Sequence, residues 1–213
     1  MEDRKIDKKD MMSCFDDMNL RLSNIGKYAE IIIAGGAALT LVHGARDSTR
    51  DIDAIFEPKA ELRPIIEEIA AEKGLPKDWL NDGVKGFITK EMKYSELLCY
   101  SNLKISTIDT EPLLAMKLTS ARQVSQDMND SLFLMKQLDI QSEAQLYDIV
   151  QKYVHPNRQT VASHYFIKEA FDQYSQQREN IKAKQSVLEE LQIQKEKIGT
   201  QKITQATVDT PHA

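Results

Sequence analysis

Residues 29–57 contain the feature that most constrains the fold: two short apolar runs, a glycine pair between them, and two closely spaced aspartates. The first run, AEIIIAGG, is rich in β-branched residues and predicts a strand over residues 31–34. The next residues, AALTLVHG, favour a helix that Gly44 ends. The second run, DIDAIFE, begins with polar–apolar alternation and predicts a half-buried strand that Pro58 stops. A strand, a glycine turn, a short helix and a returning strand therefore form one compact unit.

The glycine pair, Gly35 and Gly36, lies between the predicted strand and the predicted helix. Because glycine has no Cβ, the backbone at such a pair can approach a ligand closely. The helix that begins there directs its free N–H groups into the same space, which suits a phosphate. Gly-Gly turns are also common for structural reasons alone, so the pair by itself assigns no site.

The two aspartates, Asp51 and Asp53, are separated by one residue. Residues i and i+2 of a strand point to the same face, so the two carboxylates would lie side by side. Like charges so placed repel unless a cation lies between them, and Mg²⁺ prefers carboxylate and phosphate oxygens. The alternative is an exposed edge strand whose acids are neutralised by Arg46 or Arg50.

The two features taken together favour one site. The helix N-terminus and the carboxylates can converge on a single triphosphate with its metal ion. The segment HGARDSTRD, between the predicted helix and the second strand, adds Arg46, Ser48, Thr49 and Arg50 as phosphate partners.

The rest of the chain predicts an α+β core followed by helices. The expected elements are a helix over 11–28, a helix over 59–73, strands over 97–100 and 103–108 joined by the dipeptide SN, a helix from 110, and a nearly continuous helical pattern over 142–198 that breaks near His155. We expect a core over residues 1–140, a helical region over 141–200 and a disordered tail over 201–213. Ile181, Leu188, Leu191 and Ile198 form a weak heptad, which suits either an oligomer contact or a partly solvated helix.

Charge and hydropathy exclude some classes of protein. With a net charge of −5, the protein lacks the overall positive charge that is typical of nucleic-acid-binding proteins. No apolar run is long enough to cross a membrane, and the start MEDRKIDKKDMMSCFDD lacks the apolar core of a secretory signal. The expected location is the cytoplasm, without membrane contact.

The glycine pair followed by D-I-D resembles the signature of the DNA polymerase-β-like nucleotidyltransferase superfamily, whose core is a small mixed sheet with flanking helices. The stretch LLAMKLTSARQVSQDMNDSLFL is similar to the K-x-x-x-A-R and D-x-x-D segment of toxin-type nucleotidyltransferases related to abortive-infection proteins. The matching residues are Lys117, Ala121, Arg122, Asp127 and Asp130. The segment GLPKDWLND also resembles bacterial proteins of this fold that carry only an unknown-function label. The likeness covers roughly residues 12–140.

The resemblance implies transfer of a nucleoside monophosphate from an NTP to an acceptor hydroxyl. Asp51 and Asp53 would hold two Mg²⁺ (or Mn²⁺) ions, and the glycine pair would hold the triphosphate. Lys117 would lie near the phosphates or the leaving group, and Asp127 or Asp130 near the acceptor or the base. On the residues alone, Lys117 equally suits a lysine that extends from a core helix to water.

A third carboxylate often completes such a site, and the sequence leaves Asp109, Asp127 and Asp130 open for that place. Asp109 equally suits an N-cap, because it precedes a helix with Pro112 in its first turn. Trp79 either stacks on a base or anchors a loop. Ala37 stands where the family's turn often carries serine.

Three functions follow from these observations. The first is a toxin or phage-defence nucleotidyltransferase that modifies tRNA, another RNA or a protein hydroxyl, with a cognate antitoxin as partner. The second is an antibiotic-modifying nucleotidyltransferase. The third is a non-catalytic interaction module of the same fold. The basic segments over 4–9 and 182–202 are diluted with acids, so charge alone does not select RNA as the substrate.

Overall fold

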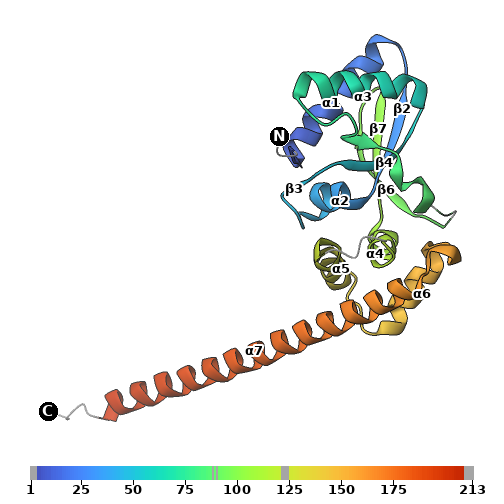
Figure 1. The fold of residues 1–213 in the computed structure, drawn as a ribbon. Helices are drawn as coiled ribbons and strands as arrows, with labels where there is room; N and C mark the ends of the chain where they lie inside the picture. The colour runs from blue at the N-terminus through green and yellow to red at the C-terminus, as the bar shows by residue number, and fades with distance from the viewer. Residues whose placement is uncertain (1–3, 88, 90, 121–124, 209–213) are drawn as a thin grey trace. The chain divides into compact units, whose positions relative to one another are not determined.

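The computed structural model describes residues 4–87, 89, 91–120 and 125–208, and for residues 87, 125 and 190–208 only the backbone. The chain divides into two compact units, residues 1–170 and residues 171–213. The first unit contains a mixed sheet and the helices that pack on it (Figure 1). The predicted fold class, an α+β core followed by a helical region, is confirmed.

The central sheet is mixed and has the strand order β5-β4-β2-β7-β6 among the described residues. Its strands are β2 (Ala29–Ile33), β4 (Ile52–Glu57), β5 (Leu80–Asn81), β6 (Tyr94–Cys99) and β7 (Leu103–Ile108). β2 pairs antiparallel with β4 and parallel with β7. β6 and β7 form the predicted hairpin. Because β2 and β4 run in opposite directions, the end of β2 and the start of β4 meet at one edge of the sheet.

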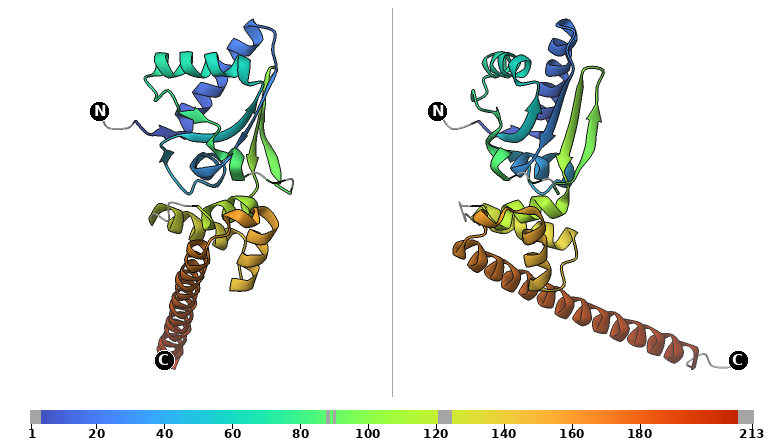
Figure 2. Two further views of the ribbon diagram at one scale, coloured as in Figure 1. Left: turned by 45° about the vertical axis from the view of Figure 1, so that its right-hand side comes forward. Right: turned by 90° about the vertical axis from the view of Figure 1, so that its right-hand side faces the viewer.

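Two helices, α1 (Lys8–Asn24) and α3 (Lys59–Lys73), cover one face of this sheet. Figure 2 shows both helices on the same side of the strands. The covered face carries the buried alternate residues of β2 and β4, such as Ile31, Ile33, Ala54 and Phe56. The other alternate residues, Asp53 among them, therefore point away from this core.

The bounds of α1 differ from the predicted helix over 11–28, whereas α3 ends at the glycine that the sequence predicts. Asp7 caps α1 through a capping box with Asp10. Gly74 ends α3 in the left-handed conformation, with φ of 64°. The stop at Gly74 was predictable because it is a local glycine signal, whereas the apolar spacing of α1 did not indicate Asp7 as its cap.

The glycine pair belongs to a helical segment rather than to a free turn. α2 (Gly35–Ala38) begins at Gly35 and continues as the π-helical turn η1 (Leu39–His43), which Gly44 ends with φ of 59°. A short strand β3 (Ser48–Thr49) follows and pairs with β1 (Ile6–Asp7). This two-stranded sheet fixes the position of the segment that joins the glycine pair to β4.

Further helices complete the first unit, which continues beyond residue 140, where the sequence predicts the end of the core. They are α4 (Thr110–Leu118), α5 (Ser125–Gln137), α6 (Glu143–Tyr153), the 3₁₀ turn η3 (Pro156–Arg158) and the start of α7 (Val161–Val208). α4 packs against both α5 and α6. Leu146, Val150 and Tyr153 of α6 are buried, so α6 shares the core instead of forming a separate region.

The second unit consists of the part of α7 from Phe171 onward. Residues 201–208 are helical, although the sequence predicts a tail there, and residues 209–213 lie outside the described part of the chain. Ile181, Val187 and Leu188 are exposed on this helix. An oligomer contact through α7 stays a prediction. Over the residues described, no helix is long and apolar enough to cross a membrane.

Candidate functional site

The D-I-D segment lies at the start of β4. Asp53 is half-buried and alternates with Ile52 and Ala54, which are buried in the core on the opposite face. The carbonyl of Asp53 accepts a hydrogen bond of 2.8 Å from the N–H of Ala34, the residue before the glycine pair. Antiparallel pairing thus fixes the aspartate beside the glycines, as the sequence pattern predicts.

The glycines lie in direct contact with the site. A Cβ on Gly35 would lie 2.8 Å from Asp53 Oδ2, and Gly35 has φ of +61°. A Cβ on Gly36 would lie 2.6 Å from Thr49 Oγ1 and 2.9 Å from Arg46 Nη1. All three distances are too short for a real Cβ, so glycine allows these polar groups to lie this close to the backbone.

A network of charged side chains joins this edge to α4 and α5. Arg46 forms a bidentate pair with Asp130, with Nε 2.8 Å from Oδ1 and a second bond from Nη2 to Oδ2. Lys117 Nζ lies 2.8 Å from Asp127 Oδ1 and 2.9 Å from Asp130 Oδ2. Ser120 donates a hydrogen bond of 2.8 Å to the other oxygen of Asp127. The network holds two cations at the site edge.

Asp130 is the buried centre of this network, with a side chain only 2% exposed. Asp130→Asn would remove the negative charge that Arg46 and Lys117 share, and both cations are partly shielded from water. We expect unfolding free energy to fall by about 3 kcal/mol. Denaturant unfolding at neutral pH measures this change.

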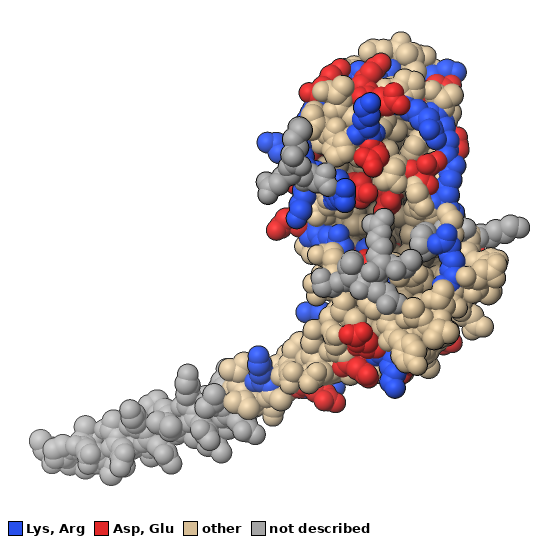
Figure 3. Space-filling model, in the orientation of Figure 1, with Lys and Arg blue, Asp and Glu red and all other residues tan. Residues whose placement is uncertain are grey.

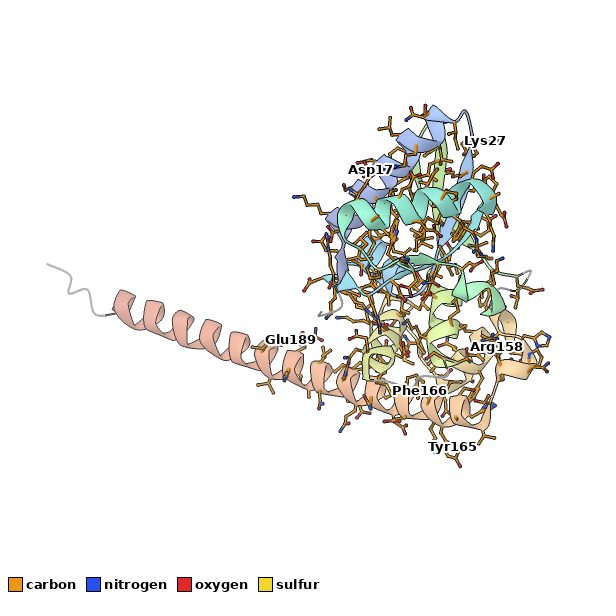
Figure 4. All side chains as sticks on the ribbon, turned by 45° about the horizontal axis from the view of Figure 1, so that its top comes forward. Asp17, Lys27, Arg158, Tyr165, Phe166 and Glu189 are labelled. Atoms are coloured by element: carbon orange, nitrogen blue, oxygen red, sulfur yellow. The ribbon has the colours of Figure 1, made fainter. Side chains whose placement is uncertain are left out.

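Asp17→Asn is the matched control for Asp130. Asp17, labelled on α1 in Figure 4, pairs with Lys73 at 2.7 Å, but its side chain is 37% exposed. The loss there should be below about 1 kcal/mol. Equal losses in the two variants would show that the Asp130 network contributes no more than a surface ion pair.

The ionisation of Asp127 links this network to pH. Burial opposes its charge, but the Lys117 ammonium and the Ser120 hydroxyl outweigh burial and hold the pKa of Asp127 below its ordinary value of 3.8. A depressed pKa stabilises the fold fully above the unfolded value and loses that contribution as pH falls through the folded pKa.

We therefore expect wild-type stability to fall more steeply below pH 3.8 than that of Asp127→Asn. The difference should be at most about 1.4 kcal/mol per pH unit, the linkage for one proton. Denaturant unfolding across the acid range measures it. Ser120→Ala removes one of the bonds to the ionised form and should move the loss to higher pH. Identical acid slopes for wild type and Asp127→Asn would contradict this account.

Two adjoining cavities of the first unit meet at these residues. The first has a volume of about 420 Å³ and is lined by Gly36, Arg46, Thr49, Arg50, Asp51, Asp53, Asp78, Lys117, Gln126 and Asp127. The second has a volume of about 670 Å³ and is lined by Gly35, Asp51, Asp53, Asp78, Asn81, Gly83, Val84, Leu113, Met116, Lys117, Ser120, Asp127 and Arg158. Four aspartates and Lys117 belong to both linings, so they form the junction between the cavities.

Most residues predicted for the site line one or both cavities. Ser48 and Asp130 line neither cavity. Asp130 instead forms ion pairs with Arg46 and Lys117, which do line the cavities. Asp109 also lines neither cavity, and its Oδ1 accepts a hydrogen bond of 2.7 Å from Ser95. Of the three carboxylates that the sequence leaves open, only Asp127 reaches the cavities. Arg122 lies outside the described residues.

Trp79 does not offer a stacking surface, which corrects one reading of the sequence. Its side chain is fully buried, and its indole N–H donates to the carbonyl of Ile66 at 3.0 Å. Its own carbonyl accepts from the N–H of Ile52 at 2.7 Å. Trp79 therefore anchors its loop beside β4.

Sequence reasoning missed Asp78 and Arg158 as residues of the cavities, and it did not assign Asn81 to the site. Asp78 and Asn81 flank Trp79, so the buried tryptophan carries them to the cavity edge. The isolated tryptophan was the signal that could have indicated this segment. Arg158 follows the helix break at Pro156 and has no local signal that links it to the site.

The carboxylates of Asp51 and Asp53 suit a divalent cation that a substrate also coordinates. Within the described parts of the chain, no three His, Cys, Asp or Glu side chains are grouped closely enough to hold a metal ion. No described residue bonds the Asp53 carboxylate, which faces both cavities beside Asp51. Mg²⁺ commonly takes one or two carboxylates and completes its shell with water and phosphate oxygens, so the pair suffices for that mode.

The geometry brings the carboxylates of Asp51 and Asp53, a glycine-lined backbone and Arg and Lys side chains to two adjoining polar cavities. Arg and Lys side chains of this kind are suited to bind phosphate. Residues 9–182 match the model of DUF6036, a family described as a nucleotidyltransferase of unknown function. This match spans most of the chain, so the chain belongs to that family. Comparison with curated proteins and with solved structures gave no match.

Proposed function

We propose that this chain is a metal-dependent nucleotidyltransferase that transfers a nucleoside monophosphate from an NTP to an acceptor hydroxyl on RNA, such as tRNA, or on protein. The observation that carries the proposal is the convergence of Asp53, the glycine pair and the Arg46–Lys117 network on one cavity. Family membership supports the reaction class. The resemblance of Lys117, Asp127 and Asp130 to a toxin-type segment favours a toxin or defence role with an antitoxin partner.

Each side chain has a role that follows from its surroundings. Asp51 and Asp53 would hold Mg²⁺, which when bound neutralises charge on the phosphate oxygens. Arg46 and Lys117 stabilise the triphosphate and the leaving pyrophosphate by charge. The acceptor oxygen forms a bond to the α-phosphorus, the bond to the bridging oxygen breaks, and pyrophosphate and the hydroxyl proton leave.

Asp127 is better suited to hold Lys117 than to take the acceptor proton. Both of its oxygens are engaged, one by Lys117 and one by Ser120. Its depressed pKa makes it a weak base. Asp127 therefore serves in this proposal as the partner that positions the lysine.

Surface charge does not select between RNA and protein as acceptor. On the face shown in Figure 3, Lys and Arg side chains alternate with Asp and Glu over the part of the chain that contains the sheet. An RNA acceptor usually requires a continuous basic path. The acceptor is therefore an outcome of the experiment.

The test incubates the full chain with each NTP labelled at the α-phosphorus, Mg²⁺ and either total RNA or cell lysate. We expect metal-dependent transfer of label into a product that either ribonuclease or protease destroys. Label from the γ-phosphorus should not be transferred, which separates this reaction from a kinase. Absence of transfer to both acceptor pools, together with absence of metal-dependent NTP binding, would overturn the proposal.

A further inference from the structure

The second cavity differs in chemistry from the first. Beyond the shared junction, the described lining of the first cavity adds Arg46 and Arg50, whereas that of the second adds Arg158 as its one further cation. The second cavity instead has an apolar wall made by Val84, Leu113 and Met116. A triphosphate requires cations, and a flat base requires apolar contact, so the two cavities suit different parts of one substrate.

The residues shared by the two linings lie between the cavities, so a substrate bound to them can extend into both. The carboxylates that would hold the metal ion lie in both linings, so an α-phosphate bound there has one cavity on each side. The β- and γ-phosphates belong in the first cavity, beside Arg46. The nucleoside is attached to the same α-phosphorus and must leave the junction through the remaining space.

We propose that the second cavity binds the nucleoside part of the NTP and that Arg158 reads the edge of its base. The inference rests on the proposed function, because it assumes an NTP at the junction. Leu113 and Met116 supply the apolar surface, and both are at least nine-tenths buried, so their positions are fixed by packing. Arg158 belongs to η3, between α6 and α7, and is labelled in Figure 4.

The polar groups of this cavity determine which bases fit. The amide oxygen of Asn81 accepts from the N–H of Gly83 at 2.9 Å, which leaves the NH₂ of Asn81 to donate. The hydroxyl hydrogen of Ser120 is directed to Asp127. Arg158 has only donors. The NH₂ of Asn81 and the guanidinium of Arg158 are donors that match the carbonyl oxygens of guanine, uracil or cytosine, whereas adenine has no carbonyl oxygen to accept from them.

Gly86 supports the position of Arg158. A Cβ added at Gly86 would collide with Nη2 of Arg158, so the guanidinium lies against the backbone of η2 (Gly83–Phe87). Gly86→Ala therefore displaces Arg158 without removing it. The two variants Arg158→Ala and Gly86→Ala should have the same effect on base preference.

Calorimetric titration of the full chain with Mg²⁺ tests the inference. The ligands are inorganic tripolyphosphate, which lacks a nucleoside, and the four NTP analogues with a methylene bridge between the α- and β-phosphorus, which cannot transfer. We expect wild type to bind the guanine, uracil or cytosine analogues at least about 5-fold more tightly than the adenine analogue, the range of one good base contact.

The variants separate the two cavities. Arg46→Ala should weaken tripolyphosphate and all four analogues alike. Arg158→Ala and Gly86→Ala should weaken the favoured analogues at least about 5-fold, while the binding of tripolyphosphate stays unchanged. Met116→Ala should weaken all four analogues but not tripolyphosphate, and its thermal unfolding is recorded to confirm that it folds.

Two results would overturn the inference in distinguishable ways. If wild type binds the analogues and Arg46→Ala weakens them, but Arg158→Ala, Gly86→Ala and Met116→Ala do not, the nucleoside lies elsewhere and the proposed function stands. If wild type binds neither tripolyphosphate nor any analogue, the proposed function fails and this inference fails with it.

Discussion

Asp53→Asn is expected to reduce nucleotidyl transfer by about 100-fold or more while leaving the fold intact. The substitution keeps the shape of the side chain but removes the charge that would hold Mg²⁺ beside the α-phosphate. No described residue bonds the Asp53 carboxylate, so loss of its charge breaks no hydrogen bond or ion pair among the residues that the structure describes. Transfer of α-phosphorus label measures the activity, and denaturant unfolding measures the stability.

Asp109→Asn is the matched control for Asp53. Asp109 lies at the end of β7, the strand that pairs with β2 on the side opposite β4, and it lines neither cavity. We expect its transfer activity to stay within about 3-fold of wild type, far from the loss of a transition-state contact. A large loss in Asp109→Asn would restore Asp109 as the third carboxylate. Full activity in Asp53→Asn would remove the metal role from the D-I-D segment.

Gly35→Ala is expected to abolish most transfer activity through a collision rather than through loss of a functional group. The new Cβ would lie 2.8 Å from Asp53 Oδ2, so the carboxylate must move away from its place in the cavity. The residue also has φ of +61°, where a side chain costs about 1–2 kcal/mol of stability. The label-transfer assay and denaturant unfolding record the two effects separately.

Gly26→Ala is the control that separates backbone strain at a positive φ from the collision with Asp53. Gly26 has φ of +63°, nearly that of Gly35, but nothing lies within 4 Å of its added Cβ. Both variants should lose about 1–2 kcal/mol of unfolding free energy. Only Gly35→Ala should lose activity. If both retain activity, the close approach of Gly35 to Asp53 has no part in the reaction.

The local elements of this fold were predictable because their signals are local. Gly44 and Gly74 end helices in the left-handed conformation that glycine tolerates. The alternation through Ile52, Asp53 and Ala54 predicted which face of β4 is buried, since side chains of a strand point alternately to its two faces. The glycine pair and the D-I-D segment lie within one strand–helix–strand unit, so their proximity also followed from the chain.

The boundary of the core was not predictable in the same way. The helical pattern after residue 140 gives the period of α6 but not the partner of its apolar face. That face packs on α4, so the first compact unit extends to Ala170. The partner of a helix depends on packing between distant segments, which periodicity does not describe.

The sequence by itself determined strands β2, β4, β6 and β7, most of the helices and the pairing of glycines with aspartates, because short-range sterics and alternation act within one segment. Only the tertiary structure decided which cations and which further residues reach that pair. Arg46 meets Asp130 across 84 positions of the chain. Arg158 reaches the second cavity from beyond α6, and the buried Trp79 brings Asp78 to both cavities. Such contacts are made by the packing of sheet and helices, and no local pattern encodes them.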